Sequence, residues 1–217
     1  MAKKPARGRT RANDPAGLRK RVLDAAAGSF QVHGYHSTTT HDIVREAGVT
    51  GGALHHHFAT KKELGLAVIR ERVAQAVEQS WMEPVRSART AAEGIQAAFE
   101  QIALAFDRRA TILGCPINNL ALELSLADSE FRHEIDGIFA RWREAIAQKL
   151  RADIANDVLE DLDPEAFATF VIASYSGAVT QAKAGQTTDP LRACARQLAI
   201  HMRSRGSGPS RIRRSRS

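Results

Sequence analysis

This chain of 217 residues lacks several features that mark out common classes of protein. Its two cysteines, Cys115 and Cys194, are too few for a disulfide framework and lie too far apart for a metal motif, so reduced thiols are expected. No apolar run approaches the roughly 20 residues that a membrane-spanning helix needs. The N-terminus is charged but lacks the apolar core of a secretion signal, which predicts a cytoplasmic protein with no membrane contact.

Signs of catalysis are missing too. The chain contains neither HExxH nor a Gly-rich phosphate loop, and it shows no nucleophile paired with a base. We therefore expect no enzymatic activity and no cofactor. Three consecutive histidines occur at residues 55–57, but successive side chains on a helix splay by about 100°, which disfavours a metal site.

Proline and glycine are sparse, with 7 and 15 residues, and no stretch shows the apolar-polar alternation of a strand. Hydrophobic residues still make up 43% of the chain, arranged in long runs rich in Ala, Leu, Glu, Arg and Gln. An all-α fold with a sizeable core follows. The length suits a small head followed by a larger body.

The formal net charge of +7 lies at the two ends of the chain. Residues 1–11 hold five Lys or Arg and residues 203–217 hold six Arg, with no acid in either segment. The remaining 20 basic residues face 24 acidic ones, a net charge of about −4. Residues 1–14 and 204–217 are predicted to be disordered basic tails, which either add salt-sensitive affinity for nucleic acid or contribute nothing.

The stretch 38–62 predicts two short helices joined by a tight turn, a shape that places the second helix in the major groove of DNA. A hydroxyl in the run 38–40 caps the first of these helices, and Gly48 permits the sharp exit from it. A supporting helix precedes them, starting at Asp14-Pro15 and ending at Gly34. Its expected buried stripe consists of Leu18, Val22, Ala26 and Phe30.

On the second short helix, Leu54 lies four residues before Phe58, so both are expected to face the core. The other face is left for DNA, and Gly51 and Gly52 allow a close approach of the backbone. The histidines there can donate to phosphate or to purine acceptors, with a mild pH dependence of DNA affinity, whereas His57 has the alternative of packing against neighbouring helices. The residues on the DNA-facing side and its flanks are Gly52, Ala53, His55, His56 and His57.

Residues 18–64 resemble the N-terminal domain of TetR-type (tetracycline-repressor-like) transcriptional regulators. The resemblance rests on an Ala-Ala, Phe and Gly-Tyr first helix, a Thr-capped second helix and a following Ala-Gly-Val-Thr turn. The matching residues are Ala25, Ala26, Phe30, Gly34, Tyr35, Thr39, Ile43, Ala47, Gly48, Val49, Thr50, Gly52, Leu54, His57, Phe58 and Lys61.

This resemblance implies a DNA-binding domain over residues 15–60 and a ligand-binding and dimerisation domain over residues 61–203. Two departures from the family pattern, His55 in place of Tyr and Gly51 in place of a polar residue, predict readout partly through DNA shape or water. The implied DNA contacts are Thr39, Thr40, His41, Thr50, Gly51, Gly52, Ala53, His55, His56, His57 and Lys61.

Six further helices are expected in the body, which makes nine in all. Their apolar stripes either line a ligand site or form a plain core. Glu83-Pro84 is expected to end the first of them. The predicted helices lie over residues 61–81, 90–109, 117–124 and 128–150, and two more begin at Asp163-Pro164 and Asp189-Pro190.

Cys115 sits at a helix start, with Pro116 suited to the first helical position. Free N–H groups there favour a reactive thiolate, but a lone cysteine is also a common buried filler. The resemblance extends to Gly114-Cys115 and the segment 119–123, which occur in family members that respond to oxidants or electrophiles. The expected ligand-binding or sensing residues are Phe99, Phe106, Cys115, Asn119, Trp142 and Tyr175.

The family resemblance also implies a homodimer in which the last two helices pair with their copies. Two recognition helices must then lie roughly 34 to 36 Å apart to enter successive major grooves. The expected interface residues are Phe167, Phe170, Ser174, Gly177, Ala178, Leu191, Cys194 and Leu198.

Together these features predict a ligand-responsive transcriptional repressor. It would bind a palindromic operator in double-stranded DNA as a homodimer and would be released by a small-molecule effector or by thiol modification. The alternative is an architectural DNA binder without sequence preference that depends on its two basic tails.

Overall fold

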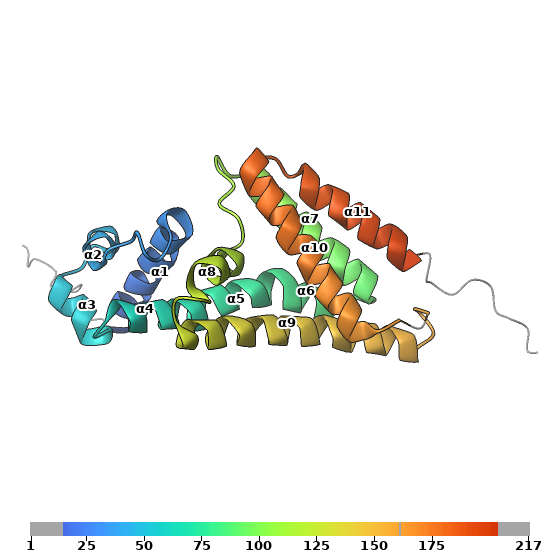
Figure 1. The fold of residues 1–217 in the computed structure, drawn as a ribbon, viewed down its shortest axis with the longest axis horizontal. Coiled ribbons are helices and arrows are strands. Elements are labelled where there is room, and N and C mark those ends of the chain that lie inside the picture. Colours follow the sequence, from blue (N-terminus) through green and yellow to red (C-terminus); the bar gives the residue numbers. More distant parts are fainter. Residues whose placement is uncertain (1–14, 161, 204–217) are drawn as a thin grey trace, which may run out of the picture. The chain divides into compact units, whose positions relative to one another are not determined.

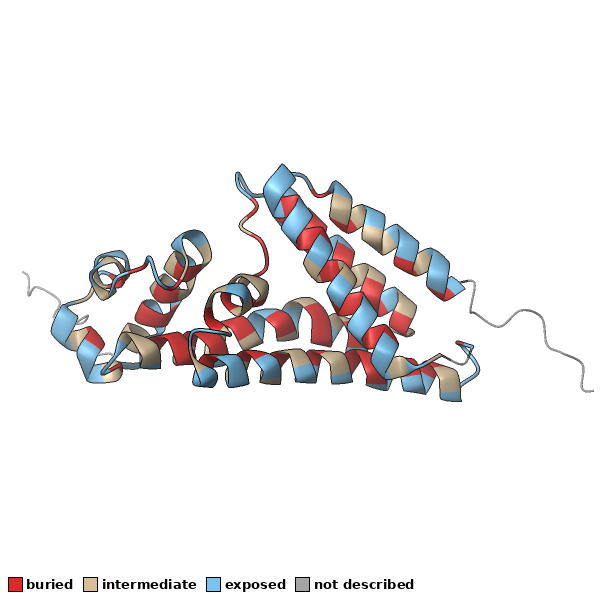
Figure 2. Ribbon diagram, in the orientation of Figure 1, coloured by how far each residue is buried: buried red, intermediate tan, exposed pale blue. Residues whose placement is uncertain are grey.

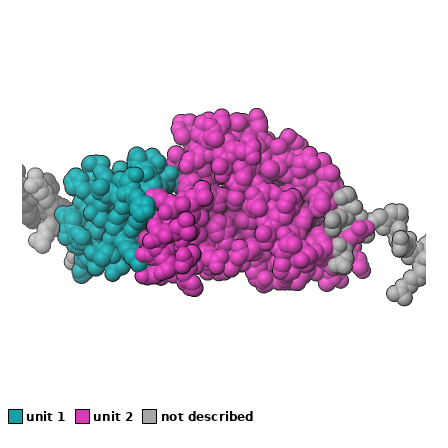
Figure 3. All heavy atoms as spheres, in the orientation of Figure 1, with its two compact units in different colours: residues 1–68 teal, residues 69–217 magenta. Residues whose placement is uncertain are grey.

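The computed structural model describes residues 15–160 and 162–203, and every regular element within them is helical (Figure 1). The predicted all-α fold is therefore confirmed, whereas the two predicted basic tails lie outside the described residues. By its internal contacts the chain divides into two compact units, Met1–Val68 and Ile69–Ser217 (Figure 3). The first unit extends eight residues beyond the domain boundary expected at residue 60.

The first unit contains α1 (Pro15–His33), α2 (Thr40–Ala47), α3 (Gly51–His57) and α4 (Lys61–Val68). Helix α1 is its centre, because it contacts each of the other three helices. The predicted stripe on α1 is buried at Val22, Ala26 and Phe30, and Leu23 joins it, while Leu18 is only half-buried. The three-helix head is thus built as expected, with α4 packed against α1 in the same unit.

The second unit begins with η1 (Ile69–Val73), α5 (Ala74–Val77), η2 (Glu78–Met82) and α6 (Glu83–Ser87), which follow one another without a break. The expected helix end at Glu83-Pro84 is wrong, since the helix continues to Ser87. Pro84 lies in the first turn of α6, directly after the π-helical turn η2. A wider π turn gives room for the proline ring, and its missing N–H costs little there.

The remaining helices of this unit are α7 (Ala91–Asp107), α8 (Pro116–Leu124), α9 (Ser129–Ala155), α10 (Pro164–Gly185) and α11 (Asp189–Arg203). Helix α10 contacts α9 and α11, and α11 contacts α7, so one core lies between these four helices (Figure 2). The largest buried side chains, Trp81 and Trp142, lie in it. The aromatic residues expected near a ligand therefore belong to the core of the body.

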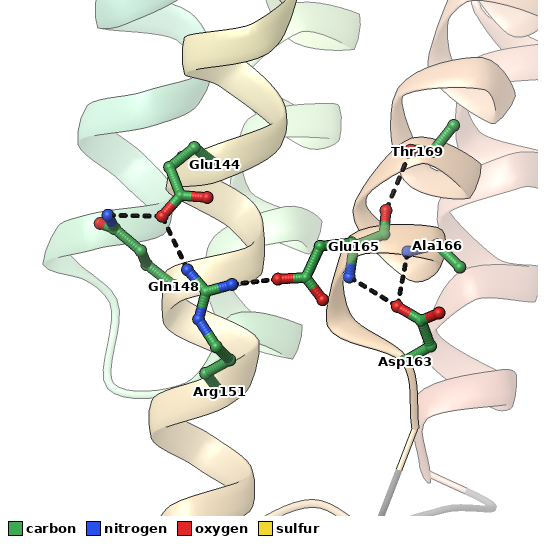
Figure 4. A network of polar contacts seen from close by, with 7 residues as sticks. All are labelled: Glu144, Gln148, Arg151, Asp163, Glu165, Ala166 and Thr169. Carbon is green, nitrogen blue, oxygen red and sulfur yellow. Dashed lines mark hydrogen bonds and ion pairs between the residues drawn. The ribbon is translucent and has the colours of Figure 1, made fainter.

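A polar network joins the end of α9 to the start of α10 (Figure 4). Arg151 pairs with Glu144 at 2.7 Å and also with Glu165. The Asp163 carboxylate accepts from the backbone N–H groups of Glu165 and Ala166, both at 3.0 Å, and so caps α10. The helix start predicted from Asp163-Pro164 is confirmed, because the carboxylate meets the free N–H groups of the first turn.

Candidate DNA-binding and effector sites

Helix α2 starts with a reciprocal cap that fixes which threonine faces outward. The Asp42 N–H donates to Thr39 Oγ1 at 3.1 Å, and the Thr39 N–H donates back to Asp42 Oδ2 at 3.1 Å. The Thr39 hydroxyl, then the Thr39 N–H and then the Arg45 guanidinium hold the pKa of Asp42 below its usual value. Thr38 is instead buried and donates to the Gly34 carbonyl at 2.7 Å. At the start of α2, Thr39 and His41 are therefore exposed, and Thr40 is half-buried.

The turn between α2 and α3 requires a left-handed residue, which Gly48 supplies with φ of 61°. Its N–H donates to the Arg45 carbonyl at 3.3 Å, and the next N–H donates to the Val44 carbonyl at 3.2 Å. Thr50 then caps α3 by accepting from the Ala53 N–H at 3.2 Å. The helix-turn-helix expected from the sequence is confirmed in this local geometry.

The two faces of α3 differ as predicted. Leu54 is 1% exposed and Phe58, which follows the helix, is 4% exposed. The outer face consists of Gly51, Gly52, His55 and His56, all exposed, with Ala53 and His57 half-buried beside them. His57 is half-buried, and its ring lies 6.4 Å from the ring of the next residue, Phe58.

The two glycines of α3 are not required by the protein's own packing. A Cβ built at Gly51 or Gly52 meets no atom of the described residues within 4 Å. Because glycine in a helix costs about 1 kcal/mol relative to alanine, something other than internal fit accounts for the pair. An open, side-chain-free helix start is suited to close approach by another molecule.

Lys61, expected to contact phosphate, is held by the head itself. Its Nζ lies 4.4 Å from the centroid of the Tyr35 ring and donates to the His36 carbonyl at 3.3 Å. These contacts orient the lysine at the start of α4. The sequence indicated Tyr35 only as part of the family pattern. Its contact with Lys61 could not be predicted, because the fold brings together two residues that lie 26 positions apart in the chain.

Cys115 occupies the position before α8, as expected, and its surroundings favour the buried-filler alternative over the reactive thiolate. Burial raises the pKa of the Cys115 thiol, whose residue is 6% exposed, while hydrogen bonds from the Asn118 N–H, the Tyr175 hydroxyl and the Ile117 N–H act in the opposite direction. Desolvation of a thiolate in this surrounding outweighs the free N–H groups of the helix start. Cys115 is therefore shielded, and its surroundings disfavour the thiolate.

An aromatic cluster lies next to Cys115, and it consists of Trp81, Phe99, Trp142 and Tyr175. The ring of Trp81 lies 5.3 Å from Phe99, 5.0 Å from Trp142 and 4.8 Å from Tyr175, measured between centroids. Burial, and then the neighbouring Cys115, raise the pKa of the Tyr175 phenol well above its usual value. Sequence analysis missed Trp81, although it continues the stripe of Val73 and Val77 at a spacing of four residues.

Two further residues expected at the effector site have different surroundings. Asn119 donates to the Leu113 carbonyl at 3.0 Å and accepts from Lys183 at 3.4 Å, so it ties the start of α8 to α10. Phe106 is buried, but no ring contact joins it to the aromatic cluster in the described part of the chain. The fold therefore brings Phe99, Cys115, Trp142 and Tyr175 together and leaves Phe106 apart.

The residues expected at a dimer interface fall into two sets of four. One set faces outward from α10 and α11, with Phe170 52% exposed, and it consists of Phe170, Ser174, Gly177 and Cys194. The other set is buried within the chain and consists of Phe167, Ala178, Leu191 and Leu198. A groove of about 520 Å³ runs along the outward side, lined by Phe170, Ser174, Ala193, Cys194, Gln197, Leu198, Ile200 and His201.

None of the helices within residues 15–160 and 162–203 is long and apolar enough to cross a membrane. Within the same residues, no group of three or more His, Cys, Asp or Glu side chains is arranged to hold a metal ion.

Known families match both units of the chain. Residues 22–68 match the model of bacterial regulatory proteins of the tetR family, and residues 91–197 match the C-terminal domain of LmrA/YxaF-like transcriptional regulators. These matches define a helix-turn-helix regulator of transcription, which is not an enzyme. The chain belongs to the TetR family, with a C-terminal domain of the LmrA/YxaF-like type.

Individual relatives agree with this assignment. The regulator LmrA of Bacillus subtilis is 30% identical over 61% of this chain and 71% of its own length. The repressor DhaR of a Mycobacterium species is 26% identical over 80% of this chain and 86% of its own. A TetR regulator of Chloroflexus aurantiacus, solved as a crystal structure, is 27% identical with a TM-score of 0.80, over 88% of this chain and 97% of that one.

Proposed function

We propose that the protein is a ligand-responsive repressor that binds a palindromic operator as a homodimer and leaves it when a small molecule or a thiol modification acts on the body. The observation that carries this proposal is the outer face of α3, where Gly51 and Gly52 are open and His55 and His56 are exposed. That face belongs to a TetR-type head, and the relative DhaR is described as a repressor.

Operator contacts follow from the two helix starts of the head. Thr40 and His41 at the start of α2 and Thr50 at the start of α3 lie beside free N–H groups, which suit phosphate oxygens. His55 and His56 can donate to base or phosphate acceptors. Since Gly51 and Gly52 offer no side-chain donor, base readout from them is expected to depend on DNA shape and on water.

The dimer is supported by the groove along α10 and α11. Phe170 and Ile200 are 52% and 50% exposed there, and burying such side chains against a second copy is favourable by the hydrophobic effect. The outward Gly177 allows a close approach of two helices. A two-fold pair of this kind presents two α3 helices to one palindrome.

Control by an effector is supported by the aromatic cluster and Cys115, which join segments from η2, α7, α8, α9 and α10. A ligand that moves these segments apart changes the conformation of the body. Complete switching from 1:99 to 99:1 requires about 5.5 kcal/mol of preferential binding to one state. Because burial shields the Cys115 thiol, modification of it requires that the body first opens.

Selection of bound DNA from a random pool tests this function. A two-fold symmetric consensus is expected, with half-sites centred about one helical turn apart. A pool without any enriched palindrome would contradict operator recognition.

Removing residues 1–14 and 204–217 distinguishes the proposed repressor from the alternative, an architectural DNA binder. The shortened repressor is expected to keep its preference for the consensus and to lose only salt-dependent affinity. Loss of nearly all binding, on consensus and random DNA alike, would favour the architectural binder.

A further inference from the structure

A groove of about 440 Å³ lies at one end of the body, where the start of α7, the end of α9, the connection from α9 to α10 and the end of α11 meet (Figure 1). It shares no lining residue with the groove along α10 and α11. The side chains that matter for its chemistry are Asp153, Val158, Leu159, Met202 and Arg203.

The groove combines an apolar patch with negative charge. Val158 is 45% exposed, and it lies beside the buried Leu159 and Met202. Asp157 and Glu160, which precede and follow Val158 and Leu159 in the chain, are both exposed. Covering Val158 is favourable by the hydrophobic effect, and the two acids favour a positively charged occupant.

A buried carboxylate in the same groove points to a cation as well. Asp153 is 6% exposed, and its Oδ2 accepts from the Ala91 N–H at 2.6 Å. Within residues 15–160 and 162–203, no Lys or Arg forms an ion pair with this carboxylate. A buried charge is costly unless a charge of the opposite sign lies beside it. The groove therefore suits a segment that carries both a guanidinium group and an apolar side chain.

The chain itself continues from this groove, because Arg203 lines it and residues 204–217 follow directly. These residues lie outside the described part of the chain, but their sequence has the required chemistry. They contain five Arg and no acid, and their one large apolar side chain, Ile212, stands between two arginines. Gly206, Gly208 and Pro209 favour a reversal of the chain before Ile212.

We propose that the segment 204–217 docks in this groove of its own chain, with Ile212 against Val158 and the neighbouring arginines paired with Asp153 and Glu160. This inference goes beyond the proposed function and does not depend on it. It assigns a partner to one of the two basic tails, and it assigns a role to the acidic end of the connection from α9 to α10.

Two physical arguments favour this occupant over others. A nucleic acid would bring phosphate charges toward Asp153, Asp157 and Glu160, and like charges repel. A separate basic peptide would have to bind from solution, whereas a tethered segment has an effective concentration on the order of millimolar. The nine residues from Arg203 to Ile212 extend to at most about 30 Å, which leaves enough chain to reverse and return to the groove.

Docking also has a consequence for DNA. Arginines that pair with Asp153 and Glu160 are not available to phosphates, so the docked segment adds less sequence-independent affinity than its charge suggests. The groove thus shields a basic segment that would otherwise bind any DNA. High salt weakens both the docking and the binding to phosphate.

The docking is tested by disulfide formation in the full chain. In a Cys194→Ser background, Val158→Cys is combined with Ile212→Cys, and oxidised glutathione is added. The matched control combines Val158→Cys with Ser207→Cys, which lies closer to Arg203. A tail that is only tethered closes the shorter loop faster, whereas docking favours the longer one.

The pair at Val158 and Ile212 is expected to form its disulfide within one chain at least about fivefold faster than the control pair. Adding Glu160→Lys is expected to reduce this advantage toward one. Asp136→Lys, about 25 Å away along α9, is expected to keep it. A faster control pair, an advantage unchanged by Glu160→Lys, or a disulfide mainly between two chains would each overturn docking in the same chain.

The shielding is measured with random duplex DNA by fluorescence anisotropy at low salt. Ile212→Ser keeps every arginine but removes the apolar contact, so it is expected to bind random DNA at least about twofold more tightly than the wild type. Leu122→Ser, at a residue 86% exposed on α8, is the control and is expected to bind as the wild type does. An Ile212→Ser variant that binds no more tightly than the wild type would overturn the shielding.

Discussion

The side chain of Gln186 holds the backbone of Ile112 by two hydrogen bonds. Its Oε1 accepts from the Ile112 N–H at 2.9 Å, and its Nε2 donates to the Ile112 carbonyl at 3.1 Å. Gln186 ends α10, with φ of 51°, while Ile112 lies in the connection from α7 to Cys115. The end of a proposed dimer helix is thus fastened to the segment that carries the proposed sensor.

Replacing Gln186 with alanine is expected to lower the free energy of unfolding by about 1 to 2 kcal/mol, because two backbone groups of Ile112 lose their partners. Alanine also has a Cβ at the same left-handed position, so the backbone strain is unchanged. Urea unfolding followed by circular dichroism measures the change. Gln148→Ala, which removes an exposed contact with Glu144, serves as the control and should cost less than about 0.5 kcal/mol. Equal losses in the two variants would contradict the role given to Gln186.

Replacing Gly52 with alanine is expected to have opposite effects on stability and on DNA affinity. The added Cβ meets nothing within 4 Å, so the helix should gain about 0.5 to 1 kcal/mol, whereas the close approach of DNA is obstructed. Thermal unfolding and fluorescence anisotropy on the selected operator give the two quantities. Gly28→Ala on α1 meets equally open space and is the matched control, with a similar gain in stability and unchanged affinity. If Gly52→Ala binds the operator as tightly as the wild type does, α3 does not lie in the DNA interface.

Replacing Phe170 with glutamate is expected to convert the homodimer to monomers, because a charge is then placed in the apolar surface that the second copy would cover. Light scattering after size-exclusion chromatography measures the mass. Leu122→Glu, at an apolar side chain that is 86% exposed on α8, tests whether any exposed leucine or phenylalanine would do the same. Dissociation by the control, or none by Phe170→Glu, would contradict the interface on α10 and α11.

The Cys115 thiol is expected to resist alkylation in the folded protein. Burial raises its pKa, so little thiolate is present at neutral pH, and the surrounding side chains block access. In a Cys194→Ser background, iodoacetamide should react at least about a hundredfold more slowly than in urea, as followed by mass spectrometry. An effector that opens the aromatic cluster should speed the reaction. Rapid alkylation without urea or ligand would favour direct thiol sensing instead.

Low pH is expected to weaken the attachment of α11 to α7. Asp107 accepts from Arg192 at 2.8 Å and from the buried Thr188 at 2.8 Å, and these bonds, Arg192 first, hold the pKa of Asp107 below its usual 3.8. A lowered pKa means that the stabilisation is present above the usual value and is lost as pH falls through the folded value. Asp107→Asn should therefore be less stable than the wild type at pH 7 and approach it near pH 3. If the difference in urea midpoint between Asp107→Asn and the wild type does not narrow as the pH falls, a group other than Asp107 causes the pH dependence.

The helix caps, the turn and the helix faces of the head could be predicted, because each of them depends on residues that are close together in the chain. A hydroxyl cap within residues 38–40, the Gly48 turn and the opposite faces of α3 follow from helix geometry within a few residues. The helix starts at Asp163 and Asp189 follow in the same way. The continuation past Pro84 could not be predicted, since it follows the π turn η2, which no local sequence signal announces.

The sequence by itself determined the helical class, the helix-turn-helix of the head and the exposed face of α3, because period, caps and glycine placement act over single turns of chain. Only the tertiary structure decided the state of Cys115, since desolvation comes from side chains on other helices and outweighs the helix start. It also decided which interface candidates face outward, and it brought Trp81 next to Trp142 and Tyr175, because these side chains come from helices far apart in the chain.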